Sequence, residues 1–429
     1  MATPASASPP ATARPGRLGP AYAKLWTAAA VSYVGDGIHD TALPLLAASL
    51  TRDPLLVAAV GVAGQLPWLL FALPGGALAD RWDRRRVLWR VDAYRSLVVA
   101  ALAAAVVAGW ATIPMLGAAG FLLAAGATLF NPASMSIVPA IVSREPARLE
   151  RANGRLAAAQ TAGWHLLGPP AGGVLFSLAR PVPFVADAVS FAISSAVIAT
   201  IPGRFAATPP GTAAAARSAS SGGGLRAQIR EGVRWLARHR LLRTLAVMAA
   251  IQQLGLAAWS SILVLFAQDR LGLGNLGFGL LWTGVAAGSL LGSLLAARLS
   301  RAVGTATVLL ASAITLGVAT LGIGVSTNPW TAGSLLGTIG IALTVWNVVA
   351  ISLRQAIVPD RLIGRVNSVF QQLSMGMLPV GAALGGLLGH TLGLRAPFLI
   401  TGVMLLAAAV LAMPAVTSHA IDAARTHLS

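Results

Sequence analysis

The sequence lacks cysteine altogether and carries few charged residues, only 10% of its 429 positions. Because there is no thiol, disulfide bridges, cysteine nucleophiles and cysteine-ligated metal sites are excluded. Soluble domains carry about 25% charged residues, so this composition fits a soluble fold poorly. Acidic residues are scarcer than basic ones, with 13 Asp and Glu against 31 Lys and Arg, and the formal net charge is +18.

The sequence patterns of common enzymes are missing as well. There is no Walker A motif, no HExxH motif, no metal-ligand spacing and no Ser/His/Asp arrangement. Residues 272–277 match GxGxxG, but no strand precedes them, so we interpret them as a turn and not as a dinucleotide site. We therefore expect a protein that is not an enzyme, with no catalytic residue, no metal site and no cofactor.

Long apolar runs dominate what is present, since 56% of the residues are hydrophobic. A run of 18 or more apolar residues can cross a hydrocarbon core of roughly 30 Å. Such a span is expected to be helical, because lipid offers no hydrogen-bond partners to its backbone. We predict an all-α membrane protein with twelve spans. They cover residues 25–50, 55–79, 87–109, 112–141, 153–178, 181–202, 242–267, 275–298, 304–326, 330–357, 366–390 and 395–415.

The spans form two sets of six, separated by a segment of different composition. The predicted parts are a disordered cytoplasmic tail (1–22), a first half (23–202), a cytoplasmic linker (203–240), a second half (241–415) and a cytoplasmic C-terminal tail (416–429). The linker is rich in Pro, Gly and Ser, which is typical of flexible chain. Its last part, 225–240, alternates apolar residues and arginines in a way that predicts an amphipathic helix on the anionic leaflet.

The arginines lie in the short segments between the apolar runs. A charge of +18 would suggest nucleic acid in a soluble protein, but here it indicates positive-inside topology. Only four arginines fall on the outer side: Arg52, Arg180, Arg270 and Arg395. We expect a multi-pass protein of the cell membrane with both termini in the cytoplasm and with no nucleic-acid partner.

The two halves repeat one another. Residues 26–81 align without a gap with residues 243–298, and residues 141–154 are echoed by residues 357–368. In this register Asp36 falls on Gln253, so an acid is not needed at that position by the shared scaffold. Two repeated halves are typical of transporters that alternate around a central site.

The stretch Gly76-x-Leu78-Ala79-Asp80-Arg81-x-x-Arg84-Arg85-Arg86 resembles motif A of the major facilitator superfamily, and a degenerate copy lies at 292–301. The resemblance extends from about Tyr22 to Pro414. Within the superfamily the chain looks most like the group of enterobactin exporters and macrolide-efflux proteins. The signatures that carry this are Gly35-Asp36, Asn131-Pro132-Ala133 and Asp187-Ala188-x-Ser190-Phe191.

The resemblance implies that motif A gates the transporter. By this analogy Asp80 meets the positive end of the eleventh span in the outward-facing state, with Arg365 as a further candidate partner. The residues implied to take part are Gly76, Asp80, Arg81, Arg84, Arg85, Asp92 and Arg365. The arginines would pair with carboxylates, of which Asp92 is the nearest by sequence; alternatively they only set topology. Asp83 departs from the family pattern, which has Gly there.

Four acids lie within predicted spans: Asp36, Asp40, Asp92 and Asp187. A carboxylate at bilayer depth is costly, so each is a candidate functional residue. Asp36 and Asp40 share one helical face. We favour Asp36 as a proton-coupling or substrate residue over a structural role, and we expect Asp40 nearer the outer end of the span.

Three further expectations concern His39, Asp92 and Asp187. His39 is grouped with Asp36, Asp40 and Asp187 as a candidate proton-coupling or substrate residue, but we expect it to face a neighbour and not to titrate usefully. We expect Asp92 to pair with Arg95 one turn away. Asp187 lies near the outer end of its span, where a functional role and a structural role fit equally well.

The fifth predicted span contains Gly168-Pro169-Pro170-Ala171-Gly172-Gly173, which resembles the core of the antiporter motif. The spacing departs from that motif, because Gly163 lies five residues before Gly168 and not four. The resemblance implies a segment that seals the central cavity; the alternative is simple packing of a bent helix. His165 could face the cavity or pack as a neutral side chain.

A largely apolar cavity with a few polar anchors suits amphipathic molecules. Candidate lining residues, besides His165, are Gln65, Trp68, Asn131, Gln160, Trp164, Gln252, Gln253, Trp259, Trp282, Trp346, Asn347, Gln371 and Gln372. Trp residues near span ends can instead form the interfacial belt.

These features together predict a monomeric, proton-coupled exporter of amphipathic small molecules such as drugs, siderophores or other natural products. Its energy source would be the proton gradient and its partners the substrate and the lipid bilayer. An uptake or lipid-handling permease of the same fold is the first alternative. A membrane scaffold or sensor that transports nothing is the second.

Overall fold

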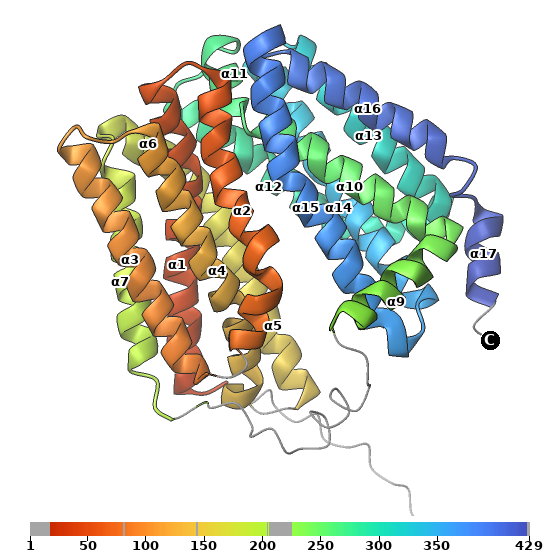
Figure 1. Cartoon of the computed structure of the whole chain (residues 1–429), viewed down its shortest axis with the longest axis horizontal. Helices are drawn as coiled ribbons and strands as arrows, with labels where there is room; N and C mark the ends of the chain where they lie inside the picture. Colours follow the sequence, from red (N-terminus) through yellow and green to blue (C-terminus); the bar gives the residue numbers. More distant parts are fainter. Residues whose placement is uncertain (1–17, 80–81, 143–144, 204, 206–224, 427–429) are drawn as a thin grey trace, which may run out of the picture.

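A computed structural model describes residues 18–79, 82–142, 145–203, 205 and 225–426 of the chain (Figure 1). Every regular element within these ranges is a helix. Asp80, Arg81, most of the predicted N-terminal tail and the Pro-, Gly- and Ser-rich part of the linker lie outside them.

The helices before the linker are α1 (Pro20–Leu50), α2 (Pro54–Ala79), α3 (Arg84–Val107), α4 (Ile113–Val142), α5 (Pro146–Gln160), the π-helix η1 (Thr161–Leu167), α6 (Gly168–Leu178) and α7 (Val182–Ala199). The linker contributes α9 (Leu225–Arg238). The helices after it are α10 (Arg240–Ser260), α11 (Leu263–Asp269), α12 (Asn275–Val303), α13 (Thr305–Val325), α14 (Pro329–Ile357), α15 (Asp360–Leu392), α16 (Ala396–Ala412) and α17 (Ser418–Thr426).

Helix occupies each of the twelve segments predicted as spans, but two of the segments are interrupted. The fifth is divided among α5, η1 and α6, and the seventh breaks between α10 and α11. The predicted tail boundaries also need correction. Tyr22 belongs to α1, where it is buried and donates its hydroxyl to the carbonyl oxygen of Ala152 at 2.8 Å. The segment predicted as a C-terminal tail contains α17, whose Ile421 is buried.

Eight described helices are long and apolar enough to cross a membrane: α2, α4, α7, α10, α12, α13, α14 and α15. Helices α1 and α3 are not among them, and they are the helices that carry Asp36 and Asp40, and Asp92 and Arg95. Three of the four candidate acids thus lie on helices outside this set, and the fourth, Asp187, lies on α7 within it. The total of twelve spans stays a prediction.

The helices pack as two groups, an N-terminal group of α1–α7 and a C-terminal group of α10–α16. The groups contact each other mainly through α2 with α15 and through α6 and η1 with α12. Contacts between them cluster at one end of the molecule, where Gly386 and Gly389 of α15 lie against Ala58 and Pro54 of α2. We call this the joined end. The ribbons diverge from it towards the end at which α9 lies (Figure 1).

A hydrophobic cluster fills the joined end and draws side chains from both groups. Leu45 and Phe176 come from the N-terminal group, and Trp259, Phe266 and Phe398 from the C-terminal group. Trp259 stacks on Phe398 and on Trp282, with ring centroids 6.0 and 6.3 Å apart, and is 1% exposed. Trp259 is thus a core residue, and its assignment to the lining of a cavity is wrong.

The internal repeat is visible in the packing. Pro44 lies inside α1, and in the repeat register it falls on Ser261, where α10 and α11 are separated. Gly37 of α1 contacts Gly168, and the equivalent Leu254 of α10 contacts Gly381 of α15. These contacts agree with the repeat, and the layout of two six-helix halves stays a prediction.

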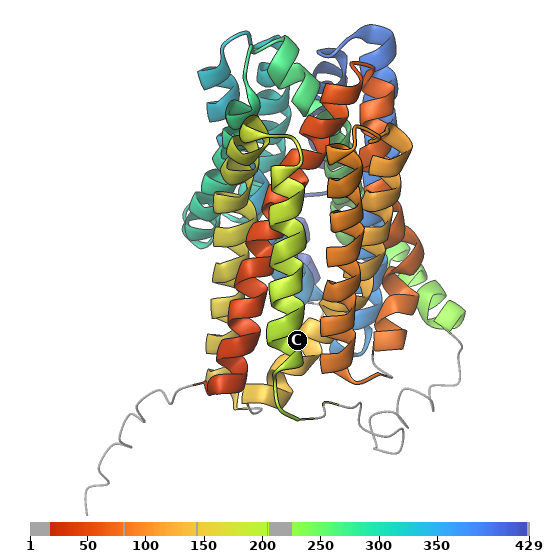
Figure 2. The same cartoon turned by 90° about the vertical axis from the view of Figure 1, so that its left-hand side faces the viewer.

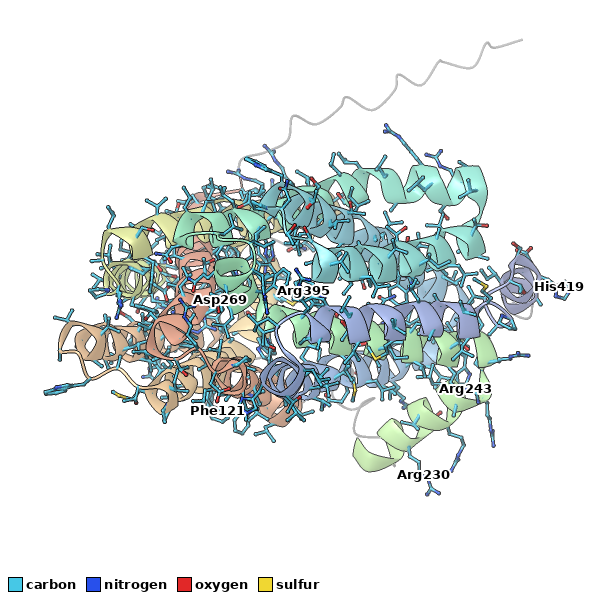
Figure 3. The ribbon with its side chains drawn as sticks, turned by 90° about the horizontal axis from the view of Figure 1, so that it is seen from above. Phe121, Arg230, Arg243, Asp269, Arg395 and His419 are labelled. Carbon is cyan, nitrogen blue, oxygen red and sulfur yellow. The ribbon has the colours of Figure 1, made fainter. Side chains whose placement is uncertain are left out.

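The linker helix α9 packs on the C-terminal group. Leu236 is buried in a cluster with residues of α10 and α15, and Gly232 lies against the backbone of Arg365. Arg365 forms an ion pair with Glu231 of α9. Arg230 points away from the bundle (Figure 3). The predicted amphipathic helix is confirmed as a helix, and its contact with a lipid surface stays a prediction.

Candidate functional site: a layer of acids between α1, α3 and α7

Two acids, Asp36 and Asp40, lie near the middle of α1. Asp36 is half-buried and forms no hydrogen bond or ion pair with another described residue. Asp40, one turn further on, is exposed and accepts a hydrogen bond from Trp164 Nε1 of η1 at 2.7 Å. Asp40 lies ten residues before the end of α1, which corresponds to roughly 15 Å along the helix. Asp40 lies nearer than Asp36 to the C-terminal end of α1 and is not buried, as expected, and that this end is the outer one stays a prediction.

The acids of α1 are backed by a buried pair from a second helix. Helices α1 and α7 run side by side (Figure 2). His39 Nδ1 lies 3.1 Å from the Asp187 carboxylate, and the exposed fractions of the two side chains are 8% and 1%. The prediction that His39 faces a neighbour is confirmed, and that neighbour is Asp187. Asp187 belongs to the first part of α7, as expected, but it is fully enclosed by protein.

Glycine at position 35 permits this close contact. A Cβ atom there would lie 2.6 Å from Asp187 Oδ1 and 2.8 Å from Ser190 Cβ. Two of the signatures noted in the sequence, Gly35-Asp36 and Asp187-Ala188-x-Ser190-Phe191, therefore meet face to face. Their residues are separated by about 150 positions along the chain, and the structure brings them into one site.

A third helix contributes a buried acid and the balancing cation. Asp92 of α3 lies 3.8 Å from Arg95 and accepts a hydrogen bond of 2.6 Å from the Ser194 hydroxyl of α7. The guanidinium of Arg95 also lies over the rings of Phe130 and Phe191, at 5.1 and 5.4 Å. The predicted Asp92–Arg95 pair is confirmed. Ser194 was missed, although it follows Ser190 by one turn on the face that carries Asp187.

We call these residues the acidic layer: Asp36, His39, Asp40, Asp92, Arg95 and Asp187. Buried charges persist only when they are paired or hydrogen-bonded, which holds for Asp92 and Asp187. Asp36 has no such partner among the described residues, which sets it apart from Asp92 and Asp187.

The C-terminal group offers amides in place of acids. Gln252 is 5% exposed and its Nε2 has no hydrogen-bond partner among the described residues, whereas Gln253, the repeat equivalent of Asp36, is half-buried. The predicted polar cavity residues are scattered over α2, α4, α5, η1, α10, α14 and α15. Gln65, Gln160 and Gln253 are half-buried, and Asn131, His165, Asn347 and Gln371 are exposed.

The segment that resembles the antiporter motif is built around a π-helix. The backbone N–H of Gly168 donates to the carbonyl oxygen of Gly163, five residues earlier, as in a π-turn. The spacing of five residues between Gly163 and Gly168, which departs from the motif, thus corresponds to one wide turn of π-helix. Pro169 and Pro170 follow it, and since neither has an N–H, they leave the preceding carbonyls without α-helical donors.

The glycines of this segment contact both groups. A Cβ atom on Gly168 would lie 2.5 Å from Gly37 Cα, and one on Gly172 would lie 2.7 Å from the carbonyl oxygen of Ile38. Gly173 faces Asn275 of α12 instead. Pro169 lies against Gly279, also of α12. The structure therefore shows that this segment packs tightly. That it also seals the central cavity stays a prediction. His165 stacks on Trp164, with ring centroids 5.4 Å apart.

The motif A region is described only in part. Gly76 lies in the last turn of α2, and Asp80 and Arg81 lie outside the described residues. Asp83, which replaces the family's Gly, caps α3 by accepting from the backbone N–H of Arg86 at 3.0 Å and also accepts from Phe205 N–H at 3.1 Å.

Two predicted pairings of motif A differ in the structure. Arg85 donates to the carbonyl oxygen of Ile201 at 2.5 Å, and Asp92 pairs with Arg95 on its own helix. Asp92 lies about two turns beyond Arg85 but one turn before Arg95, which explains the choice of partner. Arg84 contacts Phe205 through its backbone, and Arg365 pairs with Glu231. Glu231 was not anticipated.

Known proteins resemble this chain along nearly its whole length. The family profile described as "transmembrane secretion effector" matches residues 16–427. The multidrug efflux pump Tap of Mycobacterium bovis (strain BCG / Pasteur 1173P2) is 29% identical over 402 residues, covering 89% of this chain and 90% of that protein. Tap of Mycolicibacterium fortuitum is 29% identical over 393 residues, covering 90% and 93%.

Solved structures of transporters share the fold. A bacterial homologue of the iron transporter ferroportin in an inward-facing state superposes with a TM-score of 0.73 at 17% identity, covering 92% of this chain and 98% of that one. A bacterial homologue of the lysosomal transporter Spinster, inward-facing and unoccupied, gives 0.71 at 16% identity, covering 94% and 98%. The family and these relatives are transporters and not enzymes, and the chain belongs to the transmembrane secretion effector family of the major facilitator superfamily.

Proposed function

We propose that this chain is a proton-coupled exporter of amphipathic small molecules in the cell membrane. It has twelve spans in two six-helix halves, with both termini in the cytoplasm. The observation that carries the proposal is Asp36, a half-buried acid without a partner among the described residues, in the middle of an otherwise paired acidic layer. The efflux direction is supported by relatives named multidrug efflux pumps.

In this proposal the acidic layer binds the proton and the region between the groups binds substrate. Protonation removes the charge of Asp36, which lowers the cost of enclosing it when the halves change their contact. Release of the proton restores a carboxylate that can attract a cationic substrate. Asp40, His39 and Asp187 complete the site, since Asp40 shares the face of Asp36 and the His39–Asp187 pair fixes α1 against α7.

Alternating access would proceed by rocking about the joined end. With the termini in the cytoplasm, the joined end is the extracellular side and the structure is the inward-facing conformation. The motif A residues and Arg365 would then act at the opposite end, where the halves must close for the outward-facing state. The segment Gly168–Gly173, which touches both α1 and α12, is placed to follow that movement.

Purified protein in proteoliposomes tests the proposal. An imposed pH gradient should drive accumulation of ethidium, a fluorescent amphipathic cation, and collapse of the gradient should abolish the accumulation. Asp36→Asn should remove gradient-driven transport, because an amide can neither bind nor release the proton. The matched control is Glu150→Gln, which removes an exposed carboxylate of α5 and should transport normally.

Two results would reject the proposal. Gradient-driven transport that persists in Asp36→Asn would show that another group couples the proton. Ethidium flux that ignores the gradient in the unaltered protein would exclude proton antiport. Flux in the opposite direction under the same gradient would favour the uptake permease.

A further inference from the structure

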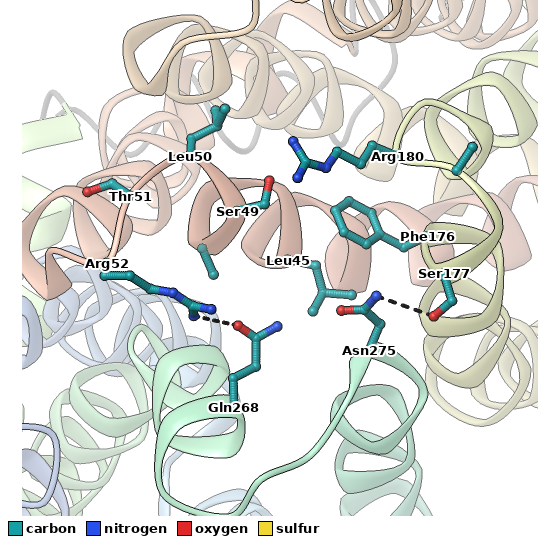
Figure 4. Close-up of a pocket in the computed structure, with 12 residues that line it drawn as sticks. Leu45, Ser49, Leu50, Thr51, Arg52, Phe176, Ser177, Arg180, Gln268 and Asn275 are labelled. Carbon is teal, nitrogen blue, oxygen red and sulfur yellow. Dashed lines mark hydrogen bonds between the residues drawn. The ribbon is translucent and has the colours of Figure 1, made fainter.

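The joined end carries a polar pocket that the transport mechanism above does not use. Its volume is about 650 Å³, within the usual range of small-molecule sites. It lies between the ends of α1 and α6 on one side and α11 and α12 on the other (Figure 4). Both groups of helices therefore supply its walls.

Two arginines line this pocket, and none of its lining residues is acidic. Arg52 and Arg180 are two of the four arginines assigned to the outer side, and both extend into the pocket (Figure 4). Their convergence on one pocket concentrates positive charge on a face that is otherwise poor in it. Ser49, Ser177, Gln268 and Asn275 add hydroxyl and amide groups.

The two guanidinium groups are not equivalent. Arg52 donates to Gln268 at 2.6 Å and lies 3.5 Å from Asp269, so its charge is partly neutralised by a carboxylate of the C-terminal group. Arg180 forms no hydrogen bond or ion pair with any other residue that the structure describes, and it is exposed. Arg180 thus supplies the uncompensated charge. An anion that lies between the two arginines would receive charge-assisted hydrogen bonds from both.

The rest of the lining selects an anion with an apolar body. Leu45 and Phe176, which belong to the hydrophobic cluster of the joined end, form part of the wall beneath the arginines, and Leu50 adds another apolar side chain. Asn275 Nδ2 donates to Ser177 Oγ at 3.3 Å, which ties α12 to α6 across the pocket. We propose that this pocket binds an amphipathic organic anion, such as an aromatic sulfonate or carboxylate, and that the bound anion holds the two groups of helices together.

The proposal does not depend on the direction or the coupling of transport. A ligand that contacts both groups binds the joined conformation more tightly than any conformation in which these walls separate. It therefore stabilises the joined end, and its effect is measurable without a transport assay.

The absence of cysteine permits a direct test. Ala179 is an exposed pocket residue, and Ala179→Cys introduces the only thiol of the chain. The rate of its reaction with a cationic methanethiosulfonate reagent is measured for purified protein in lipid nanodiscs, where both faces are accessible. Naphthalene-2-sulfonate should slow this reaction in a saturable way. Its neutral analogue naphthalene-2-sulfonamide should protect at least about tenfold less well, as expected for loss of an ionic hydrogen bond.

Arginine variants in the Ala179→Cys background identify the binding groups. Arg180→Gln should raise the sulfonate concentration needed for half-protection by about tenfold or more, and Arg52→Gln by less, because Asp269 already offsets that charge. The matched control is Arg395→Gln, an arginine near the same end (Figure 3) that is not among the pocket's lining residues. It should leave protection unchanged. Equal protection by sulfonate and sulfonamide, or unchanged protection in Arg180→Gln, would overturn the proposal.

Thermal unfolding of the cysteine-free protein gives an independent reading. Naphthalene-2-sulfonate should raise the Tm of the unaltered protein and of Arg395→Gln, because a ligand that binds only the folded state stabilises it. The same concentration should raise the Tm of Arg180→Gln far less. A Tm increase of equal size in all three proteins would place the anion elsewhere and contradict the assignment.

Discussion

At the scale of single residues, part of the acidic layer is packed so closely that a larger side chain would displace its helices. His39 and Asp187 come from different helices and are almost fully enclosed. Their position is set by the absence of a side chain at Gly35, since the α1 backbone there lies directly against Asp187 and Ser190. The geometry of the site is therefore controlled by a residue that has no polar group of its own.

Gly35→Ala should destabilise the protein by about 1–3 kcal/mol, as overpacking of a close helix contact typically does. The added methyl group would lie 2.6 Å from Asp187 Oδ1, so α1 and α7 must separate. The measurement is the Tm in detergent, followed by ethidium transport. Gly61→Ala is the matched control, because a Cβ atom at Gly61 meets nothing within 4 Å. If the two variants melt at the same temperature, the close contact between α1 and α7 is wrong.

Single residues also show what a sequence can and cannot predict. The Asp92–Arg95 pair was predictable because both residues lie on one helix, one turn apart. The His39–Asp187 pair was not, because its members are 148 positions apart and only the packing of α1 on α7 brings them together. Trp259 was misplaced for the same reason. Its burial depends on Trp282 and Phe398, which no local pattern identifies as its neighbours.

At the scale of helices, the linker is more than a connection between the two groups. Helix α9 is fixed to α15 by the Glu231–Arg365 ion pair and by the contact of Gly232 with the Arg365 backbone. The amphipathic pattern predicted the helix itself. It did not predict the docking partner, because an apolar face can pack on protein as well as on lipid.

Gly232→Val should detach α9 from α15. A Cβ atom at Gly232 would already lie 3.1 Å from the carbonyl oxygen of Arg365, and two further methyl groups have no room. Detached α9 should be cleaved several-fold faster by trypsin at its arginines, which is measured by mass spectrometry after brief digestion. Ala237→Val places the same side chain at an exposed position of α9 and should be cleaved at the original rate. Equal cleavage of the two variants would mean that α9 does not depend on this contact.

The joined end also contains an ion pair that links the loop after α1 to the last turn of α15. His390 Nδ1 lies 2.9 Å from Asp53 Oδ1, which also accepts from the Leu55 backbone N–H at 2.9 Å. Desolvation alone would raise the pKa of Asp53. The hydrogen bonds from Leu55 and His390 outweigh it and leave the pKa of Asp53 below its ordinary value. Asp53 therefore stays ionised over a wider acidic range than a free aspartate.

The sign of the resulting pH dependence follows from that lowered pKa. A group whose pKa is depressed in the folded state contributes stability above its ordinary pKa of about 4 and loses that contribution as the pH falls through the folded value. Tm measured from pH 7 downwards should thus show a decline below pH 4 that is smaller in Asp53→Asn. Glu145→Gln, which removes an exposed carboxylate elsewhere, should decline like the unaltered protein. Identical profiles for all three proteins would mean that the Asp53–His390 pair contributes nothing.

At the scale of the whole molecule, two groups of helices meet at one end and diverge towards the other (Figure 1). The repeat at a constant offset predicted two related groups, and equivalent contacts of Gly37 and Leu254 agree with it. Which end is joined could not be read from the sequence, because each sequence of this kind must be compatible with more than one conformation.

A cross-link at the joined end should abolish transport. Asp53→Cys and His390→Cys in the cysteine-free chain, joined by a short bismaleimide, would hold the two groups together and prevent the rocking motion. Ethidium transport in proteoliposomes should fall to background after cross-linking. Ser326→Cys and Thr331→Cys form the control pair, because the two hydroxyls lie 2.7 Å apart within the C-terminal group. Transport that survives the first cross-link would mean that the joined end does not open.

The wide turn of η1 has a consequence for how relatives of this chain are found. One additional residue between Gly163 and Gly168 is taken up within η1, so the glycines on either side still reach α1 and the helix beyond still reaches α12. In this chain the segment therefore contacts both α1 and α12 although its spacing departs from the motif. A pattern that demands a fixed interval before the Gly-Pro pair would pass over chains built in this way, and a pattern that allows one extra residue there would recover them.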